Sequence, residues 1–452
     1  MTDKGSVIRA QVCIIGAGAG GTGCTYRLIK NGIKTVVADK NPDFGGTAVF
    51  GGVDGWEPGV SLDGIHAEIQ KRLYDMPLAC HVTRVVSSMN LLDKNADADP
   101  RFNDYIERPW GFCMPMGDSY EDTLGRCTSI RGVDGPMRRF QFEPQCYIKA
   151  LHDIFSPYSD CLTFLPCHSY VSCKKENGKI ISVTLSDGNT EKEIYADYFV
   201  DCSGDIVLAR DAGCGYSFGR EGHDEYGEPS ATQKSQSVNG VSYVFRVAKV
   251  ADNRHIDALP DWVKNTDLGE WAKNDMKSCV SFTVQYPCGD ISFNMLPTMQ
   301  GTEYFSLSDK ADTIGKARVY AYWHYLQTEK GLSGYTLKHI CNAGIREGYR
   351  LKGKYVLKEQ DLRRGVPDLQ DFTTVAIADH AMDIHGENGM CRELEFPYKI
   401  PLECCMTKEF ENLFVACRGA SFTHIAASSA RLSRTLLSMG EGVGEYISGL
   451  MN

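Results

Sequence analysis

Three glycines and one acid near the start of the chain have the types and the spacing that hold a dinucleotide. Gly16, Gly18 and Gly21 form a Gly-x-Gly-x-x-Gly motif directly after the apolar run 12–15, and Asp39 follows a second apolar run. In such a motif the first glycine permits a tight turn, the second lets the backbone approach a pyrophosphate, and the third allows close helix packing. The acid stands where a carboxylate accepts the hydroxyls of a ribose. These four residues therefore predict a dinucleotide-binding site.

The elements that must position these residues are predicted from the same stretch. A strand over 12–15, a helix ending near Gly32 and a second strand over 35–38 form a strand–helix–strand unit. The free N–H groups at the start of that helix would meet the phosphates at the positive end of the helix dipole. The segment 48–59, which follows a glycine doublet, is rich in Gly and is expected to be a loop pressed against the ligand.

Hydrophobic periodicity predicts further helices and strands along the rest of the chain. Helices are expected over 61–75, 143–156, 310–329 and from about 426 to 447. Strands are expected over 162–173, 179–185, 198–201, 241–247, 280–286 and 413–417. Residues 93–136 are polar and irregular and are expected to cross the surface or to form a lid.

Length, charge and hydropathy narrow the class of protein. A chain of 452 residues is longer than one compact core usually covers, which predicts two domains or one elaborated unit. The net charge of −10 argues against a nucleic-acid partner, which would need a basic surface. No apolar run is long enough to span a membrane, and residues 1–10 lack the apolar core of a secretory signal. We therefore expect a cytoplasmic protein.

The cysteines are numerous, but their spacing does not indicate a metal or cluster site. None of the 18 cysteines forms Cys-x-x-Cys, so the usual iron–sulfur, zinc-ribbon and thioredoxin spacings are absent from the sequence. We therefore expect no metal. Two groups could be redox-active, although small buried apolar side chains are the favoured interpretation. These groups are the adjacent Cys404 and Cys405 and the evenly spaced Cys161, Cys167 and Cys173.

Four blocks of the sequence together resemble the FAD-dependent oxidoreductases of the glutathione-reductase-like superfamily. The blocks are GAGAGG with Asp39 and Gly45-Gly46; DCSGD at 201–205; IREGYRLKGKYVLKEQDL at 345–362 with DIH at 383–385; and FPYKIPLE at 396–403 with NLFVACRGASFTHIAASSARL at 412–432. They occur in the family's order, and the resemblance covers nearly the whole chain, most loosely from about 90 to 330.

The resemblance implies an α/β fold, in which a Rossmann-like FAD-binding domain carries an inserted α+β substrate domain. The FAD-binding domain would be discontinuous, over 1–60, 145–215 and 400–452, and the substrate or cap domain would take 61–144 and 216–399. A second strand–glycine motif–helix unit for NAD(P)H is not found in the sequence. The glycines Gly440, Gly442 and Gly444 lie inside the last predicted helix and are interpreted as packing residues.

The resemblance also implies which residues bind FAD. The backbone of Val171 would lie near the adenine, Arg418 and Gly419 near the ribityl and phosphate groups, and the helix start near Ala427–Ser428 at the flavin pyrimidine. The full implied set is Gly16, Gly18, Ala19, Gly20, Gly21, Asp39, Lys40, Gly45, Gly46, Thr47, Val171, Ser203, Gly204, Asp205, Arg418, Gly419, Ala427 and Ser428. In this set Asp39 replaces the commoner Glu, and Ala427 and Ser428 stand where relatives often have His and Gly.

The flavin would carry the redox chemistry, and the protein would supply orientation and a proton path. Oxidising an alcohol or an amine needs a base, for which His385 and His424 are the candidates; a structural histidine remains the alternative for each. Reducing a C=C bond would instead need an acid and a carboxylate clamp. Arg346, Arg350 and Arg392 could serve there, although salt bridges to nearby acids are the favoured interpretation.

We therefore expect an FAD-dependent oxidoreductase that transfers a hydride between a small polar metabolite and the flavin. The alternative is a flavoprotein electron-transfer subunit that works with a partner redox protein. A flavoprotein that modifies RNA is disfavoured by the acidic charge. The sequence leaves open the substrate, the direction of reaction, the electron acceptor, covalent attachment of FAD, and the oligomeric state, a homo-oligomer among the options.

Overall fold

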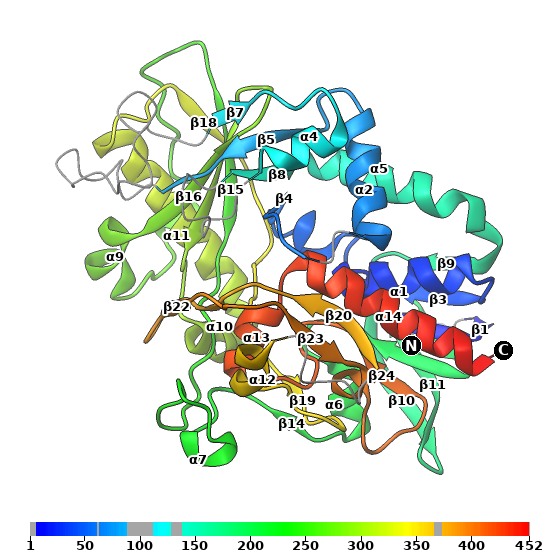
Figure 1. Ribbon diagram of the computed structural model, residues 1–452. Coiled ribbons are helices and arrows are strands. Elements are labelled where there is room, and N and C mark those ends of the chain that lie inside the picture. Colours follow the sequence, from blue (N-terminus) through cyan, green and yellow to red (C-terminus); the bar gives the residue numbers. More distant parts are fainter. Residues whose placement is uncertain (1–5, 61–62, 88–111, 128–137, 366–372, 452) are drawn as a thin grey trace.

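A parallel sheet lies at the centre of the part of the molecule that is built by the two ends of the chain (Figure 1). The computed structural model describes residues 6–60, 63–87, 112–127, 138–365 and 373–451. The sheet has five strands in the order β24-β13-β2-β3-β9, and every neighbouring pair is parallel. Its strands are β2 (Val12–Ile15), β3 (Thr35–Ala38), β9 (Leu162–Leu165), β13 (Tyr198–Asp201) and β24 (Leu413–Val415).

All five strands end in register, and Ala38 at the end of β3 pairs with Leu165 at the end of β9. Ile15 at the end of β2 pairs with Ala38 of β3 and with Asp201 of β13, and Asp201 pairs with Val415 of β24. Because the carboxyl ends of parallel strands lie at one edge of a sheet, the segments that follow them meet there. This edge therefore brings together the glycine motif, Asp39, residues 202–205 and residues 416–419.

The predicted strand–helix–strand unit is confirmed, and its helix packs against the last helix of the chain. Helix α1 (Ala19–Lys30) lies beside α14 (Ser433–Met451) in Figure 1. The two backbones approach closely, because a Cβ atom on Gly440 would lie only 2.0 Å from the carbonyl oxygen of Gly20. The packing role predicted for the glycines of α14 is thereby confirmed.

The single helix predicted from about 426 to 447 is wrong in its start and its continuity. The chain forms a short helix, α13 (His424–Ala430), and then α14, with Arg431 at the C-cap of the first. The two helices have different partners, since α13 packs on strand β21 (Met382–Ile384) and α14 packs on α1. A continuous helix would point in one direction and could not meet both surfaces.

The predicted strand 162–173 is likewise two strands in two sheets. Pro166 lacks an N–H group and interrupts the ladder after β9, and Cys167 adopts a positive φ of 56°. The second half forms β10 (Ser169–Glu176) in a separate sheet of order β1-β12-β11-β10. The other strands of that sheet are β1 (Val7–Arg9), β11 (Lys179–Ser186) and β12 (Glu191–Tyr195).

An antiparallel sheet with its own hydrophobic core forms most of the middle of the chain, on the left in Figure 1. Its order is β18-β15-β17-β16-β6, and helix α11 (Ala311–Glu329) packs against it through Trp323, which contacts Phe245 and Phe293. Trp323 is therefore a core residue. The strands are β6 (Val86–Ser87), β15 (Val244–Lys249), β16 (Val280–Gln285), β17 (Ile291–Leu296) and β18 (Tyr335–Ile340).

The remaining elements surround these sheets. A four-stranded sheet comprises β4 (Gly55–Trp56), β8 (Arg138–Phe142), β5 (Cys80–Arg84) and β7 (Phe112–Met114). Two-stranded pairs are β14 (Tyr216–Ser217) with β19 (Arg350–Leu351), β20 (Thr374–Ala378) with β23 (Tyr398–Pro401), and β21 with β22 (Met390–Arg392). The other helices are α2 (Gly64–Asp75), α4 (Tyr120–Gly125), α5 (Pro144–Phe155), α6 (Val207–Ala212), α7 (His223–Tyr226), α8 (Asp261–Lys264), α9 (Trp271–Asn274), α10 (Gly301–Leu307) and α12 (Glu359–Arg364).

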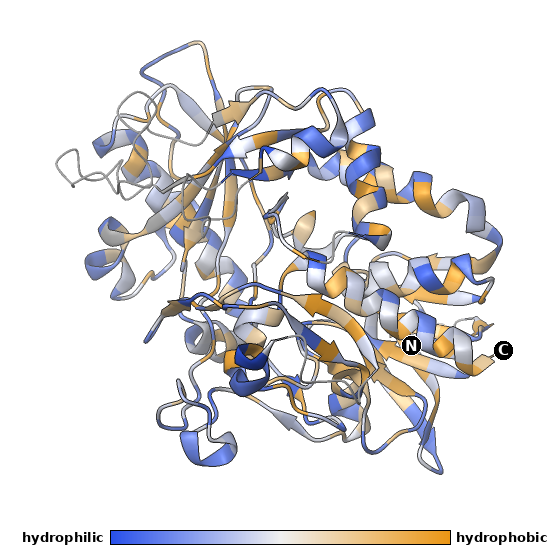
Figure 2. Ribbon diagram, viewed as in Figure 1, coloured by the Kyte–Doolittle hydropathy of each residue, from blue (hydrophilic) through white to orange (hydrophobic). Residues whose placement is uncertain are grey.

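Hydropathy follows this arrangement. In Figure 2 the strands of the parallel sheet and the neighbouring β20 are hydrophobic, whereas α7 and α12 are strongly hydrophilic.

The helices predicted over 61–75 and 143–156 are confirmed as α2 and α5. Most of the predicted lid, 93–136, lies outside the described residues. Among the helices that the structure describes, none is both long and apolar enough to cross a membrane. The domain bounds given above stay a prediction.

Candidate functional site

The glycine motif occupies positions that a side chain could not share. Gly16 directly follows β2 with a φ of 103°, and a Cβ atom there would lie 2.4 Å from the carbonyl oxygen of Cys202. A Cβ atom on Gly21 would lie 1.9 Å from the oxygen of Gly16, and one on Gly20 would lie 1.7 Å from the oxygen of Ala416. Close packing of α1 on the strand ends therefore requires these glycines.

Gly18 differs, because the space beside it is open. It is the N-cap of α1, it offers no capping side chain, and the first turn of the helix holds no acid. Among the described residues, a Cβ atom on Gly18 would have one neighbour within 4 Å, Gly46 Cα at 4.0 Å. The first N–H groups of a helix have no acceptor within the helix, and the dipole favours an anion there. This end of α1 fits a pyrophosphate.

The glycine doublet lies against the motif. The N–H of Gly45 donates to the carbonyl oxygen of Ala17 at 2.9 Å, and Gly45 has a φ of 116°. A Cβ atom on Gly46 would lie 2.7 Å from Gly18 Cα, so only a glycine permits this approach. Thr47, the next residue, is exposed at the start of the loop. The structure thus brings both predicted glycine segments together.

Asp39 lies beside the motif at the end of β3 and is only 7% exposed. Its Oδ2 atom accepts a hydrogen bond from the N–H of Ala17 at 2.6 Å, and its Oδ1 atom accepts from the N–H of Asn41 at 2.7 Å. These bonds fix the carboxylate next to the start of α1, where it fits a ribose. Lys40 is exposed, and Val171 is 48% exposed on β10. The backbone of His168, just before β10, contacts Asp39, since its N–H donates to the Asp39 carbonyl at 2.8 Å.

The ends of β13 and β24 join at the same edge. Arg418 Nη2 donates to Asp205 Oδ1 at 2.9 Å, and the Arg418 side chain fills the space beside Gly204, whose φ is 88°. A Cβ atom on Gly419 would lie 3.0 Å from the Gly204 oxygen. Ser203 instead supports the turn, since its hydroxyl donates to Asp201 Oδ1 at 2.6 Å and accepts from the N–H of Val207 at 3.0 Å. The other four predicted residues, Gly204, Asp205, Arg418 and Gly419, form one cluster.

The start of helix α13 is at His424, three residues before the predicted position of Ala427. Thr423 is the N-cap, and its hydroxyl oxygen accepts from the N–H of Ala426 at 3.2 Å. The N–H of Ala427 donates to the Thr423 carbonyl, and the Ser428 hydroxyl donates to Ile425. Ala427 and Ser428 are thus inside the helix, and the expectation that their N–H groups stand at its start is corrected.

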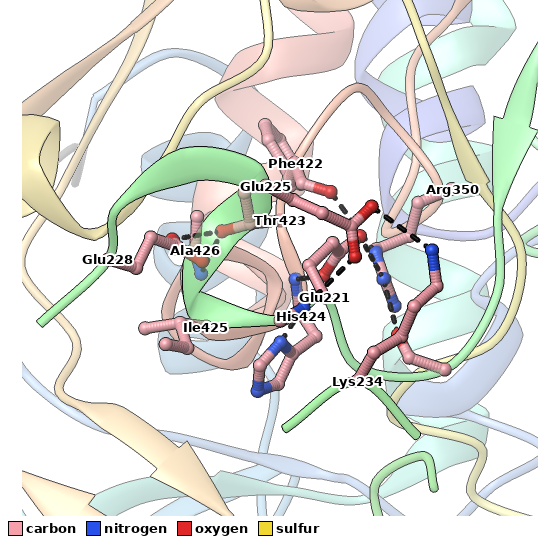
Figure 3. A network of polar contacts seen from close by, with 12 residues as sticks. Glu221, Glu225, Glu228, Lys234, Arg350, Phe422, Thr423, His424, Ile425 and Ala426 are labelled. Carbon is pink, nitrogen blue, oxygen red and sulfur yellow. Dashed lines mark hydrogen bonds and ion pairs between the residues drawn. The ribbon is translucent and has the colours of Figure 1, made fainter. Parts of the chain in front are cut away.

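His424 belongs to a buried polar network, which Figure 3 shows. Its N–H donates to Glu221 Oε2 at 2.9 Å, and its Nδ1 atom lies 3.2 Å from the same oxygen. Arg350 donates to Glu221 Oε1 at 2.7 Å and to the Phe422 carbonyl at 3.1 Å. Burial alone would raise the pKa of Glu221, but the charge of Arg350 and the hydrogen bonds from His424 hold it well below its ordinary value. Glu221 therefore stays ionised and positions His424.

His385 forms the second predicted catalytic position. Its Nε2 atom lies 2.8 Å from Asp383 Oδ2, which also accepts from Arg431 Nη2 at 2.8 Å. Burial lowers the pKa of His385, although the hydrogen bond with Asp383 opposes this. Burial would raise the pKa of Asp383, but its hydrogen bonds with histidines and the charge of Arg431 hold it far below its ordinary value. His385 is thus a neutral imidazole beside a carboxylate.

A chain of contacts connects the two histidines. The N–H of His385 donates to Asn239 Oδ1 at 2.7 Å, and the N–H of Asn239 donates to Glu347 Oε2 at 2.9 Å. Arg350 then bonds Glu347 on one side and Glu221 on the other. Sequence reasoning missed Asn239 and Glu221, because both lie in segments without periodicity or a motif.

The three predicted arginines differ in their surroundings. For Arg350 the salt-bridge interpretation is confirmed, since Glu221 and Glu347 flank it. Arg392 is exposed, and its Nη1 atom donates to Ser230 Oγ at 3.2 Å. Arg346 donates through Nη1 to the Gly240 carbonyl at 3.1 Å and to Ser242 Oγ at 2.8 Å. Within the described parts of the chain, no carboxylate pairs with Arg346.

Comparisons with known proteins show the family of the chain. The family model described as FAD dependent oxidoreductase matches residues 11–448. A curated relative, the glutamate synthase [NADPH] small chain of Halomonas elongata, is 54% identical over 41 residues; the match covers 9% of this chain and 9% of that protein. The matched segment of this chain therefore spans only a small part of that relative's length.

Three solved structures are similar at low identity. A geranylgeranyl bacteriochlorophyll reductase-like protein from Thermoplasma acidophilum is 10% identical with a TM-score of 0.47, over 99% of this chain and 79% of that one. The flavin-dependent brominase Bmp2 is 11% identical with a TM-score of 0.47, over 98% and 79%. L-proline dehydrogenase from P. horikoshii is 10% identical with a TM-score of 0.38, over 98% and 94%. These likenesses are distant, and the family model carries the assignment.

Proposed function

Since the chain belongs to the FAD-dependent oxidoreductase family, we propose that this enzyme transfers a hydride between a small polar metabolite and FAD. The observation that carries the proposal is the convergence, at one edge of the parallel sheet, of segments far apart in the sequence. The start of α1, the acid after β3 and the Arg418–Asp205 pair lie at that edge.

Each part of this edge suits one part of the cofactor. The open N-terminus of α1 beside Gly18 and Gly46 would hold the pyrophosphate, because its N–H groups are unpaired within the helix. Asp39 would accept the ribose hydroxyls, and Arg418 would bind beside the phosphates or the ribityl chain. When bound, FAD supplies the group that accepts or donates the hydride.

His385 is the best candidate for the base that takes the proton from the substrate. A carboxylate only accepts hydrogen bonds, so the contact with Asp383 places the ring proton on Nε2 and leaves Nδ1 to accept a proton. The pKa of His385 is lowered by burial, and the ring is therefore neutral and ready to act at neutral pH. Glu221 occupies Nδ1 of His424, which makes His424 a positioning residue for the start of α13.

Anaerobic flavin bleaching tests the proposal. The oxidised holoenzyme is mixed with a panel of small alcohols, amines and hydroxy acids, and the visible flavin absorbance is followed. A metabolite that bleaches the wild type should bleach His385→Gln at least ~100-fold more slowly, while the exposed control His152→Gln keeps the wild-type rate. Bleaching by no metabolite, together with reduction by a co-purifying iron–sulfur protein, would instead favour the electron-transfer subunit.

A further inference from the structure

We infer that the substrate carries a carboxylate group and that Arg346, assisted by Arg431, binds it. This inference rests on the proposed function, because it names the class of metabolite that reaches His385. It makes Arg346 a substrate-binding residue of the same site.

Arg346 contacts neutral acceptors alone among the described residues. These are the Gly240 carbonyl and the Ser242 hydroxyl, and both accept from its Nη1 atom. Across the described residues it forms no ion pair, although it is mostly removed from solvent. An arginine that is withdrawn from water normally pairs with an anion, since burying a lone charge is costly. The second nitrogen of its fork is therefore available to a ligand.

Arg350, four residues further on, provides the internal comparison. It is also buried, but Glu221 and Glu347 both pair with it, and the carbonyls of Gly219 and Phe422 accept its remaining hydrogen bonds. The same segment thus contains one arginine with a complete set of protein partners and one without. Burial and the nearby positive charge of Arg431 lower the pKa of Arg346. A bound anion would raise this pKa again, because it stabilises the charged guanidinium.

Arg346 is linked to the proposed base through Gly240. Gly240 is shared: its carbonyl accepts from Arg346, and its N–H donates to the carbonyl oxygen of His385 at 2.8 Å. Towards the cofactor edge, Gly348 contacts Asp205, because a Cβ atom on Gly348 would lie 2.1 Å from Asp205 Oδ1. The segment of Arg346 is thus linked to His385 through Gly240 and contacts Asp205 through Gly348.

The charged groups around His385 also favour an anionic ligand. Asp383 is shared between Arg431 and His385, and Glu57 lies 4.0 Å from His380 on the other side of the cluster. Asp383 forms an ion pair with Arg431 and also interacts electrostatically with Arg346. One carboxylate thus faces the positive charges of two arginines. A guanidinium binds a carboxylate through two parallel hydrogen bonds, which suits the free side of Arg346.

Matched pairs of anionic and neutral probes test this inference in the FAD-loaded enzyme. Acetate is compared with acetamide, succinate with succinamide and benzoate with benzamide, at constant ionic strength, by calorimetry and by the shift of the flavin spectrum. At least one carboxylate should bind about tenfold or more tightly than its amide, as expected for a charge-assisted hydrogen bond. Arg346→Gln should abolish that preference and leave the amide unchanged, and Arg346→Lys should keep part of it.

Controls separate this site from general effects. Arg254→Gln removes an exposed arginine elsewhere and should bind every probe as the wild type does. Both Arg346 variants should retain FAD and thermal stability, and Arg346→Lys keeps the test valid if Arg346→Gln does not fold. Equal binding of carboxylates and amides by the wild type, or an undiminished preference in Arg346→Gln, would overturn the inference. If inorganic phosphate bound more tightly than any carboxylate, the statement that the ligand carries a carboxylate would be wrong.

The two proposals fail differently. If metabolites bleach the flavin but carboxylates bind no better than amides, the hydride-transfer function stands and the substrate class is wrong. If carboxylates bind through Arg346 but no metabolite bleaches the flavin, the anion site stands and the hydride-transfer function is wrong.

Discussion

Arg418 Nη2 donates to Asp205 Oδ1 at 2.9 Å and so joins two segments that lie 213 residues apart in the chain. Both residues lie in the turns that follow strands β24 and β13 of the parallel sheet, and both side chains are partly buried. The pair lies at the same edge of the sheet as the glycine motif. Its position explains why a cofactor site can be built from distant parts of the sequence.

Breaking this pair should weaken FAD binding. In Asp205→Asn the arginine loses the charged partner that holds it at the sheet edge, so the Kd for FAD should rise roughly tenfold, which is about 1.4 kcal/mol of binding free energy. Fluorescence titration of the apoprotein with FAD measures this change. Glu329→Gln, which removes an exposed acid, is the matched control and should leave the Kd unaltered. An unchanged Kd in Asp205→Asn would remove the pair from the cofactor site.

Two glycines of the same motif should respond differently to alanine. The Cβ of Gly18→Ala meets no atom closer than 4.0 Å, so the apoprotein should fold normally, but the added methyl group would stand in the way of the pyrophosphate. Gly20→Ala places a Cβ atom 1.7 Å from the Ala416 oxygen and should destabilise the apoprotein by roughly 1–3 kcal/mol or more. Urea unfolding and FAD titration of both variants separate the two effects. Equal loss of stability in both would contradict the open space beside Gly18.

The rate of flavin reduction should depend on pH through His385. Burial lowers the pKa of this histidine below its ordinary value of 6.5, and only the neutral ring accepts a proton. The rate should therefore rise with pH, level off before neutrality, and lose this rise in His385→Gln. Stopped-flow reduction by an active metabolite across this range measures the profile. A profile shared by the wild type and the variant would assign the proton to another group.

His66 should make the stability of the protein sensitive to acid. It is completely buried against Trp56, and burial lowers its pKa to about 3 from 6.5. The unfolded chain binds a proton at this residue below pH 6.5, whereas the folded chain does not until about pH 3, so stability falls as the pH falls between these values. Between these pH values the free energy of unfolding changes by about 1.4 kcal/mol per pH unit for one proton.

The variant His66→Phe isolates this contribution, because it keeps a ring beside Trp56 and cannot be protonated. The free energy of unfolding of the wild type minus that of the variant should decrease from pH 7 towards pH 4. A constant difference across that range would show that His66 does not titrate as its burial indicates.

Arg350→Met should strongly destabilise the fold. The substitution leaves Glu221 and Glu347 buried without their cation, and losing one partner of a buried pair costs about 3–5 kcal/mol. The combined variant Arg350→Met, Glu221→Gln and Glu347→Gln removes the uncompensated charges and should recover part of the loss. Chemical denaturation measures both. If the triple variant were no more stable than the single one, the uncompensated charges would not be the cause.

The parts of the site that depend on local pattern could be predicted from the sequence. The glycine motif, β2, β3 and Asp39 follow from spacing within one stretch, and the structure brings the second glycine segment against the first. The contact between Gly204 and Arg418 could be anticipated only through the family resemblance, because no local pattern links residues so far apart.

The rest of the site depends on tertiary contacts. Glu221 and Asn239 come from irregular segments and acquire a role only when Arg350, Glu347 and His385 lie beside them. The break between α13 and α14 is also tertiary in origin, since each helix packs on a different element. Helix propensity within 424–447 does not reveal where the chain must turn.

The crystal structure of the FAD-bound enzyme tests the central claim most directly. We predict electron density for the pyrophosphate at the N-terminus of α1 beside Gly18 and Gly46, the ribose at Asp39, and the isoalloxazine on the side of His385 and Arg346. Density for the pyrophosphate away from α1, or an isoalloxazine that His385 cannot approach, would contradict the account.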